Sequence, residues 1–156
     1  MTVASAMPDR DPTHHGGMHV KLTGAAKHFS REKVFTGADH VFEAGSRTAI
    51  LGPNGSGKST LLQVVAGALV PTKGVVEHFL GGTAVDQEDV YRHVSIAAPY
   101  LGLYEDLSLR QSIANHARFK PFLKGTSLED VAGTAYLEPH LEKPVLNFRS
   151  GMKPRL

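Results

Sequence analysis

A lysine, a serine and several glycines lie at fixed spacing between residues 52 and 60. The run is Gly52-Pro53-Asn54-Gly55-Ser56-Gly57-Lys58-Ser59-Thr60, which fits the pattern G-x-x-x-x-G-K-[ST]. Glycines let the chain curl so that successive N–H groups point inward and surround phosphates. Lys58 would bring a mobile positive charge to the outer phosphates, and the Ser59 hydroxyl would bind Mg²⁺. The run therefore predicts a loop that binds a nucleoside triphosphate with Mg²⁺.

The segments on either side of this run predict a strand, a tight loop and a helix. Residues 47–51 read as a short buried strand, and residues 59–69 carry apolar side chains on nearly every face, as in a helix buried against a sheet. The N-terminus of such a helix places the positive end of its dipole beneath an anion. The alternative is a plain glycine-rich turn, and the Lys58-Ser59 pair between these flanks argues against it.

Composition bounds the remaining possibilities. The chain has 156 residues, of which 41% are hydrophobic and 21% charged, as in a single globular domain. A formal net charge of +2 is too small to indicate nucleic acid as a partner. The absence of cysteine excludes disulfides and cysteine metal sites. We expect neither a membrane span, which needs ~20 apolar residues, nor a secretory signal, because the N-terminus has no apolar core.

The first part of the chain predicts a flexible start followed by short strands. Residues 1–17 are polar and rich in Pro, Gly and His, which predicts a disordered leader. His14-His15 within it is interpreted as a solvated pair rather than a metal site. An antiparallel β flank is expected next. Its elements are a strand at 19–22, a turn region at 24–33, and strands at 34–35 and 40–42.

Phe29 is the aromatic residue of interest on this flank. It precedes Gly52 by 23 residues. An aromatic ring there could stack on an adenine, and the alternative from the residues alone is a core or edge aromatic.

After the first helix, turns and short strands lead to a polar connector. The expected elements are a turn at 71–74, a strand at 75–79, a connector at 86–91 and a buried parallel strand at 94–98. Ligands of open α/β sheets bind at the carboxyl ends of strands. Residues 99–106 are therefore expected near the nucleotide.

Two capping boxes predict a small helical insertion over residues 108–148. Ser108 stands three residues before Gln111, and Ser127 stands three residues before Asp130. In this arrangement each side chain bonds the backbone N–H of the other residue and begins a helix. Apolar residues at helical spacing follow both starts.

The spelling of the glycine-rich run and its neighbours resembles the ATP-binding subunit of ABC transporters. The resemblance covers residues 18–156 and implies an α/β fold of the P-loop NTPase (ABC ATPase) type, with an antiparallel β flank and a helical insertion. The segments that carry it are GPNGSGKSTLL, Ala66-Gly67, the turn 71–74, the Q-loop-like run 98–108 and the signature-like run 148–155.

ATP and Mg²⁺ are the ligands that the resemblance implies. Phe29 would stack on the adenine ring, the loop Gly52–Thr60 would hold the phosphates, and Ser59 would bind Mg²⁺. In the signature motif, Arg149-Ser150-Gly151 would meet the ATP held by a second subunit. On composition alone, the same C-terminal run reads as a solvated basic tail.

Three positions depart from the family pattern. Tyr100 stands where the family has the Q-loop glutamine, and a phenol is a poor Mg²⁺ ligand. Arg149 stands where the signature serine contacts the γ-phosphate, and arginine meets a phosphate with a different reach. Pro154 replaces a residue that opens the following helix, where proline is tolerated.

The family motifs that would follow the signature are the largest departure. No apolar strand ending in Asp-Glu and no switch histidine follow Arg149 before Leu156. We therefore expect the N-terminal part of the domain, truncated at the C-terminus as a fragment or a shortened reading frame. No catalytic residue is assigned, and weak nucleotide binding with hydrolysis near background is expected.

The function that the resemblance implies is coupling ATP binding and hydrolysis to solute movement across a membrane. The partners would be a transmembrane permease subunit and a second ATP-binding subunit, and the location would be cytoplasmic, at the inner face of the membrane. Nucleic acid is not expected as a partner. Two alternatives remain: a soluble ABC-type ATPase and a non-catalytic nucleotide-binding module.

Overall fold

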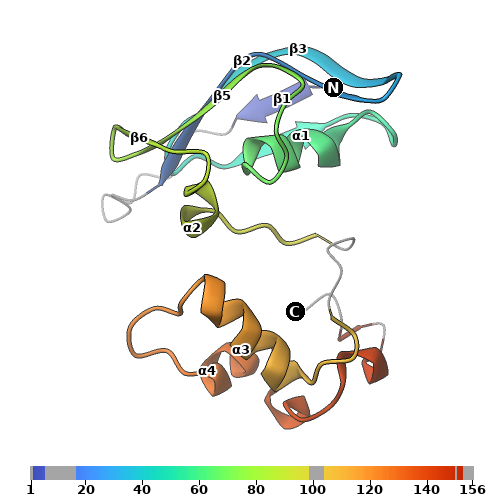
Figure 1. Ribbon diagram of the computed structural model, residues 1–156, viewed down its shortest axis with the longest axis vertical. Helices are drawn as coiled ribbons and strands as arrows, with labels where there is room; N and C mark the ends of the chain where they lie inside the picture. The colour runs from blue at the N-terminus through green and yellow to red at the C-terminus, as the bar shows by residue number, and fades with distance from the viewer. Residues whose placement is uncertain (1, 6–16, 99–103, 150, 153–156) are drawn as a thin grey trace. The chain divides into compact units, whose positions relative to one another are not determined.

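The computed structural model describes residues 2–5, 17–98, 104–149 and 151–152. The chain forms two compact units, Met1–Ile96 and Ala97–Leu156. The first unit contains the strands and two helices, and the second contains only helical elements among its described residues (Figure 1).

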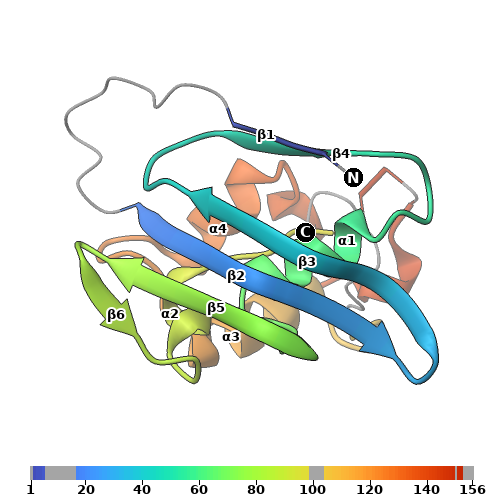
Figure 2. The same ribbon diagram turned by 90° about the horizontal axis from the view of Figure 1, so that it is seen from above.

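A four-stranded antiparallel sheet forms the first unit's main layer. Its strand order is β3-β2-β5-β6 (Figure 2). The strands are β2 (Met18–Phe29), β3 (Glu32–Phe42), β5 (Lys73–Leu80) and β6 (Thr83–Val85). The predicted antiparallel β flank is confirmed.

The boundaries expected within this flank were wrong. A turn region was expected over residues 24–33, but β2 runs through to Phe29 and turns at residues 30–31. The two short strands expected at 34–35 and 40–42 form one strand, β3. Gly24 has a φ of 57° and lies at a register shift in the β2–β3 ladder, where its N–H donates to the Asp39 carboxylate at 2.7 Å. The glycine therefore makes a bulge inside a continuous hairpin and not a turn.

A second, two-stranded antiparallel sheet joins β1 (Thr2–Ser5) to β4 (Thr48–Leu51). The strand expected at 47–51 is present, but it is not fully buried, because Leu51 is 54% exposed. Of the disordered leader expected over residues 1–17, Thr2–Ser5 pair with β4 along their whole length. Residues 1 and 6–16 lie outside the described residues, so the disorder expected there stays a prediction.

Helix α1 (Lys58–Val65) provides the core of the first unit. Leu61 contacts the β2 residues Val20, Leu22 and Ala25 in one buried cluster. α1 lies against one face of the four-stranded sheet (Figures 1 and 2). The sequence predicted a helix extending to residue 69, but α1 ends earlier because Gly67 takes a φ of 73° beside Val90.

Residues 94–98 do not form the expected buried parallel strand. They follow α2 (Val90–His93) without regular secondary structure, and they belong to no sheet among the described strands. A parallel strand needs neighbours on its edges, and β4 is paired only with β1 among the described strands. Residues 94–98 are apolar, but they have no neighbouring strand to pair with among the described strands.

Helices α3 (Leu109–Phe119) and α4 (Leu128–Thr134) form the second unit. Both predicted capping boxes are present, Ser108 with Gln111 and Ser127 with Asp130. Two short 3-10 helices follow at Glu138–His140 and Val145–Asn147. The buried residues that share one core are Leu109, Ile113, Ala132, Leu137, Leu141 and Phe148.

The described helices are all too short or too polar to cross a lipid bilayer.

Candidate nucleotide-binding site

The glycine-rich run connects the end of β4 to the start of α1, as the sequence predicted. Gly55 and Gly57 have φ values of 79° and 84°, in the left-handed region that glycine adopts without strain. At Gly57 there is also no room for a side chain. A Cβ there would lie 2.7 Å from Val34 Cγ1 and 3.1 Å from the Val34 carbonyl oxygen. The loop is therefore shaped by close contact with β3.

Backbone donors are gathered where α1 begins. The first helical bond runs from Leu61 N–H to the Gly57 carbonyl at 2.8 Å, so the N–H groups before Leu61 have no acceptor within the helix. Gly57 occupies the N-cap and supplies no side chain to them, and no acidic residue lies in the first turn. These donors and the positive end of the helix dipole suit an anion such as a phosphate group.

The Lys58 side chain folds back over its own loop. Its Nζ donates to the carbonyls of Gly52 at 2.9 Å and Pro53 at 2.7 Å. The ammonium therefore lies at the loop, where it would meet an incoming phosphate after releasing these carbonyls. The neighbouring Ser59 is exposed on the first turn of α1, so its hydroxyl is accessible to Mg²⁺. The residues present fit ATP with Mg²⁺.

The tip of the β2–β3 hairpin adjoins this loop through Val34, which contacts Gly57. Phe29, the last residue of β2, pairs with Glu32 at this tip and is 49% exposed. Its ring is therefore not a core aromatic. Lys27 makes a cation–π contact with this ring, because its Nζ lies 5.2 Å from the ring centroid.

The signature-like segment is anchored to the core of the second unit. Phe148 is buried there, and Met152 packs against the same cluster. Between them, the Met152 N–H donates to the Arg149 carbonyl at 2.8 Å and closes a turn. Arg149 and Gly151 are exposed on this turn. Ser150 lies outside the described residues, as does Tyr100.

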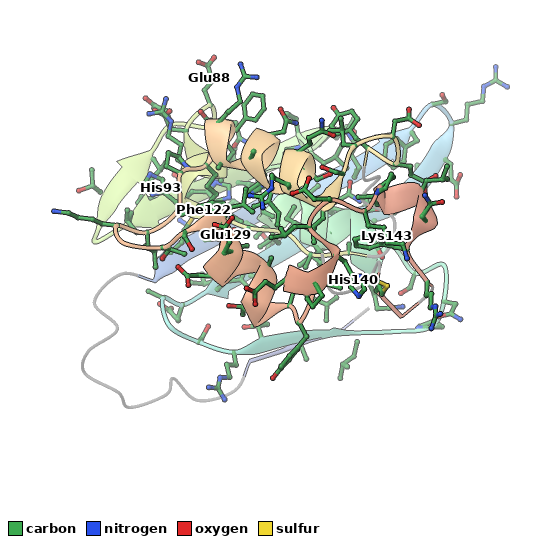
Figure 3. The ribbon with its side chains drawn as sticks, turned by 90° about the horizontal axis from the view of Figure 1, so that it is seen from below. Glu88, His93, Phe122, Glu129, His140 and Lys143 are labelled. Atoms are coloured by element: carbon green, nitrogen blue, oxygen red, sulfur yellow. The ribbon has the colours of Figure 1, made fainter. Side chains whose placement is uncertain are left out.

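Arg110 forms ion pairs with two glutamates of the second unit. Arg110 on α3 donates to Glu142 at 2.6 Å and to Glu129 at 2.8 Å, and Glu129 lies on the first turn of α4 (Figure 3). The hydrogen bonds to Glu142 and Glu129 raise the pKa of Arg110. The hydrogen bond from Arg110 lowers the pKa of Glu129.

A shallow pocket of about 640 Å³ lies on the second unit beside α3. Its lining mixes an aromatic, apolar and charged set, namely Tyr104, Asp106, Leu107, Gln111, Ala114, Asn115 and Arg118. The sequence predicted no pocket here, although Tyr104, Asp106 and Leu107 lie in the Q-loop-like run 98–108. Among the described residues, no group of three or more His, Asp or Glu side chains could hold a metal ion.

Lys27 and Val34 were also missed from the sequence. Both residues lie in segments where the turn and strand boundaries were predicted wrongly. The sequence therefore gave no indication that Lys27 lies near Phe29 or that Val34 lies near the glycine-rich run. A strand assignment through residue 29 would have placed Lys27 and Phe29 two residues apart, on one face.

Comparison with known proteins identifies the family. The family model described as ABC transporter matches residues 35–155. The sulfate/thiosulfate import ATP-binding protein CysA of Brucella melitensis is 30% identical over 67% of this chain and 29% of its own length. The taurine import ATP-binding protein TauB of Roseobacter denitrificans is 36% identical over 73% of this chain and 42% of its own length. The bacitracin transport ATP-binding protein BcrA of Bacillus licheniformis is 26% identical over 88% of this chain and 45% of its own length.

Solved structures show the same fold. An ATP-binding subunit of an ABC transporter aligns with a TM-score of 0.62 at 20% identity, over 87% of this chain and 58% of its own. A bacterial Atm1-family ABC exporter with ATP bound aligns with a TM-score of 0.68 at 22% identity, over 89% and 26%. The chain spans less than half the length of the three curated relatives named above. With its glycine-rich loop between β4 and α1, the chain belongs to the ABC transporter family.

Proposed function

We propose that this chain is part of an ABC transporter ATP-binding subunit, which couples ATP binding and hydrolysis to the movement of a solute across a membrane. The observation that carries the proposal is the loop Gly52–Thr60, which joins β4 to α1 with Lys58 bonded over it. The names of the relatives support the transport role. All three are ATP-binding proteins of import or transport systems.

The loop residues divide the work of binding the nucleotide. The N–H groups at the start of α1 would bind the inner phosphates, and Lys58 would release the carbonyls of Gly52 and Pro53 to meet the outer ones. The Ser59 hydroxyl would hold Mg²⁺, which neutralises phosphate charge when it is bound. Phe29, half exposed at the hairpin tip, would stack on the adenine ring.

A second ATP-binding subunit would complete the site. The signature-like run Arg149-Ser150-Gly151 would face the ATP held by that subunit, and the exposure of Arg149 and Gly151 supports this role. The guanidinium of Arg149 would meet phosphate oxygens through a planar set of donors.

A transmembrane permease subunit is the second partner in the proposal, and it would hold this chain at the inner face of the membrane. The pocket beside α3 is a suitable surface for it, because an exposed Tyr104 lies there with Asp106 and Arg118. Exposed aromatic and arginine side chains are enriched in protein interfaces.

Calorimetric titration of ATP with Mg²⁺ into the chain and into Lys58→Ala tests the proposal. Charge-assisted hydrogen bonds contribute about 1.5–3 kcal/mol, so we expect an affinity lower by roughly 10-fold or more in Lys58→Ala. Lys33→Ala is the matched control, because it removes the same charge from an exposed position on β3. Equal ATP affinity in the chain and in Lys58→Ala would refute the phosphate-binding role.

A further inference from the structure

The ring of Phe29 is held by a lysine that no phosphate role explains. Lys27 Nζ lies 5.2 Å from the ring centroid, within the ~6 Å at which an ammonium is attracted to an aromatic face. The same Nζ donates to the Val70 carbonyl at 2.8 Å. The ammonium is therefore fixed between an aromatic ring and a backbone acceptor.

The acceptor side of this contact is itself attached to β2. Val70 lies in the segment between α1 and β5, and two residues later Thr72 forms hydrogen bonds to β2. The Thr72 N–H donates to the Ala26 carbonyl at 2.7 Å, and the His28 N–H donates to the Thr72 hydroxyl at 3.1 Å. Lys27 thus has an anchored partner, and its ammonium restrains the rotation of an otherwise half-exposed ring.

We infer that Lys27 is a positioning residue for the nucleobase: its ammonium binds one face of Phe29 and presents the opposite face to the base of a bound adenine nucleotide. The inference rests on the proposed function. A ring that is already held loses less conformational freedom when a base stacks on it. A cation on one face also draws electron density from the ring, which favours an electron-rich purine on the other face.

The ligand pair that tests this is ATP and inorganic tripolyphosphate, which share phosphate charge but differ in the base. Lys27→Met keeps most of the side chain and removes the charge. Lys33→Met is the matched control, because it removes a charge from the same hairpin, where Lys33 pairs with His28 and has no ring contact among the described residues. Calorimetry gives the dissociation constants, and circular dichroism verifies that each variant is folded.

We expect Lys27→Met to weaken ATP binding by about two- to five-fold, because a ring that is no longer restrained loses more conformational freedom when the base stacks on it. Tripolyphosphate binding should change no more than in Lys33→Met. In the Phe29→Ala background, Lys27→Met should have no effect on ATP beyond that of Lys33→Met, because the two residues act through one contact.

Three results would overturn the inference. ATP affinity that is unchanged would show that Lys27 does not position the ring, and tighter ATP binding would show that the ammonium competes with the base. If Lys27→Met weakened the binding of ATP and of tripolyphosphate equally, Lys27 would act only through its charge on the phosphates and not through the base. If ATP affinity depends on Lys58 and not on Lys27, this inference fails while the proposed function stands. If Lys58→Ala binds ATP as tightly as the chain does, the proposed function fails first.

Discussion

At the scale of single residues, Gly55 and Gly57 share a backbone conformation but differ in their surroundings. Both have a positive φ, of 79° and 84°. A Cβ at Gly57 would collide with Val34, whereas a Cβ at Gly55 would meet no atom within 4 Å. The pattern in the sequence requires a glycine only at the second of these positions, and the contact with β3 gives a physical reason.

This difference predicts the outcome of two alanine substitutions. Gly55→Ala should cost about 1 kcal/mol of unfolding free energy, which is the strain of a left-handed alanine. Gly57→Ala should cost roughly 2–4 kcal/mol, because the collision with β3 adds to the same strain. Urea denaturation measures both variants. Equal losses would show that the Val34 contact yields without cost.

At the scale of elements, the sequence predicted best where a residue pair fixes local geometry. Both capping boxes are present because their bonds are local, and α1 likewise begins with a local bond, from the Leu61 N–H to the Gly57 carbonyl. Gly24 shows the opposite case. A glycine in a bulge and a glycine in a turn look alike in one sequence, and only pairing with a distant strand decides between them. The prediction of a strand at residues 94–98 was wrong for a similar reason, because a parallel strand depends on neighbours far along the chain.

Helix α3 offers a test of the capping argument with a control in the same helix. Ser108 Oγ accepts the Gln111 N–H at 3.2 Å, so Ser108→Ala should lower the unfolding free energy by about 1 kcal/mol. Ser112 Oγ is buried without a hydrogen-bond partner among the described residues. Ser112→Ala should therefore be neutral or stabilising, because it removes an unsatisfied polar atom. Thermal denaturation followed by circular dichroism compares the two, and a larger loss in Ser112→Ala would contradict the assignment.

At the scale of the whole molecule, hydrogen-bonded carboxylates in the second unit make stability depend on pH. The hydrogen bond from Arg110 lowers the pKa of Glu129 from its ordinary 4.5, and that from Ser127 lowers the pKa of Asp130 from 3.8. A lowered pKa in the folded state stabilises the fold above the ordinary value, and this stabilisation is lost as pH falls through the folded value.

The melting temperature should consequently fall as the pH is lowered from about 5 to about 3. In Arg110→Met the pKa of Glu129 would return toward its ordinary value, so the melting temperature should depend less steeply on pH in that range. Lys124→Met, which removes an exposed charge between α3 and α4, is the control. Identical slopes for Arg110→Met and the unmodified chain would show that the Arg110 bonds carry no pH dependence.

The two bonds from Lys58 to the carbonyls of Gly52 and Pro53 act as an internal competitor for the loop. A nucleotide that needs the Lys58 ammonium binds only those molecules in which the ammonium has left the two carbonyls. The measured association constant therefore equals the intrinsic one multiplied by the fraction of molecules in this released state. If the bonds together favour the closed form by roughly 1.4 kcal/mol, only about a tenth of the molecules are ready at any moment. Because an exposed side chain moves within nanoseconds, this release lowers the affinity but does not become the rate-limiting step of binding.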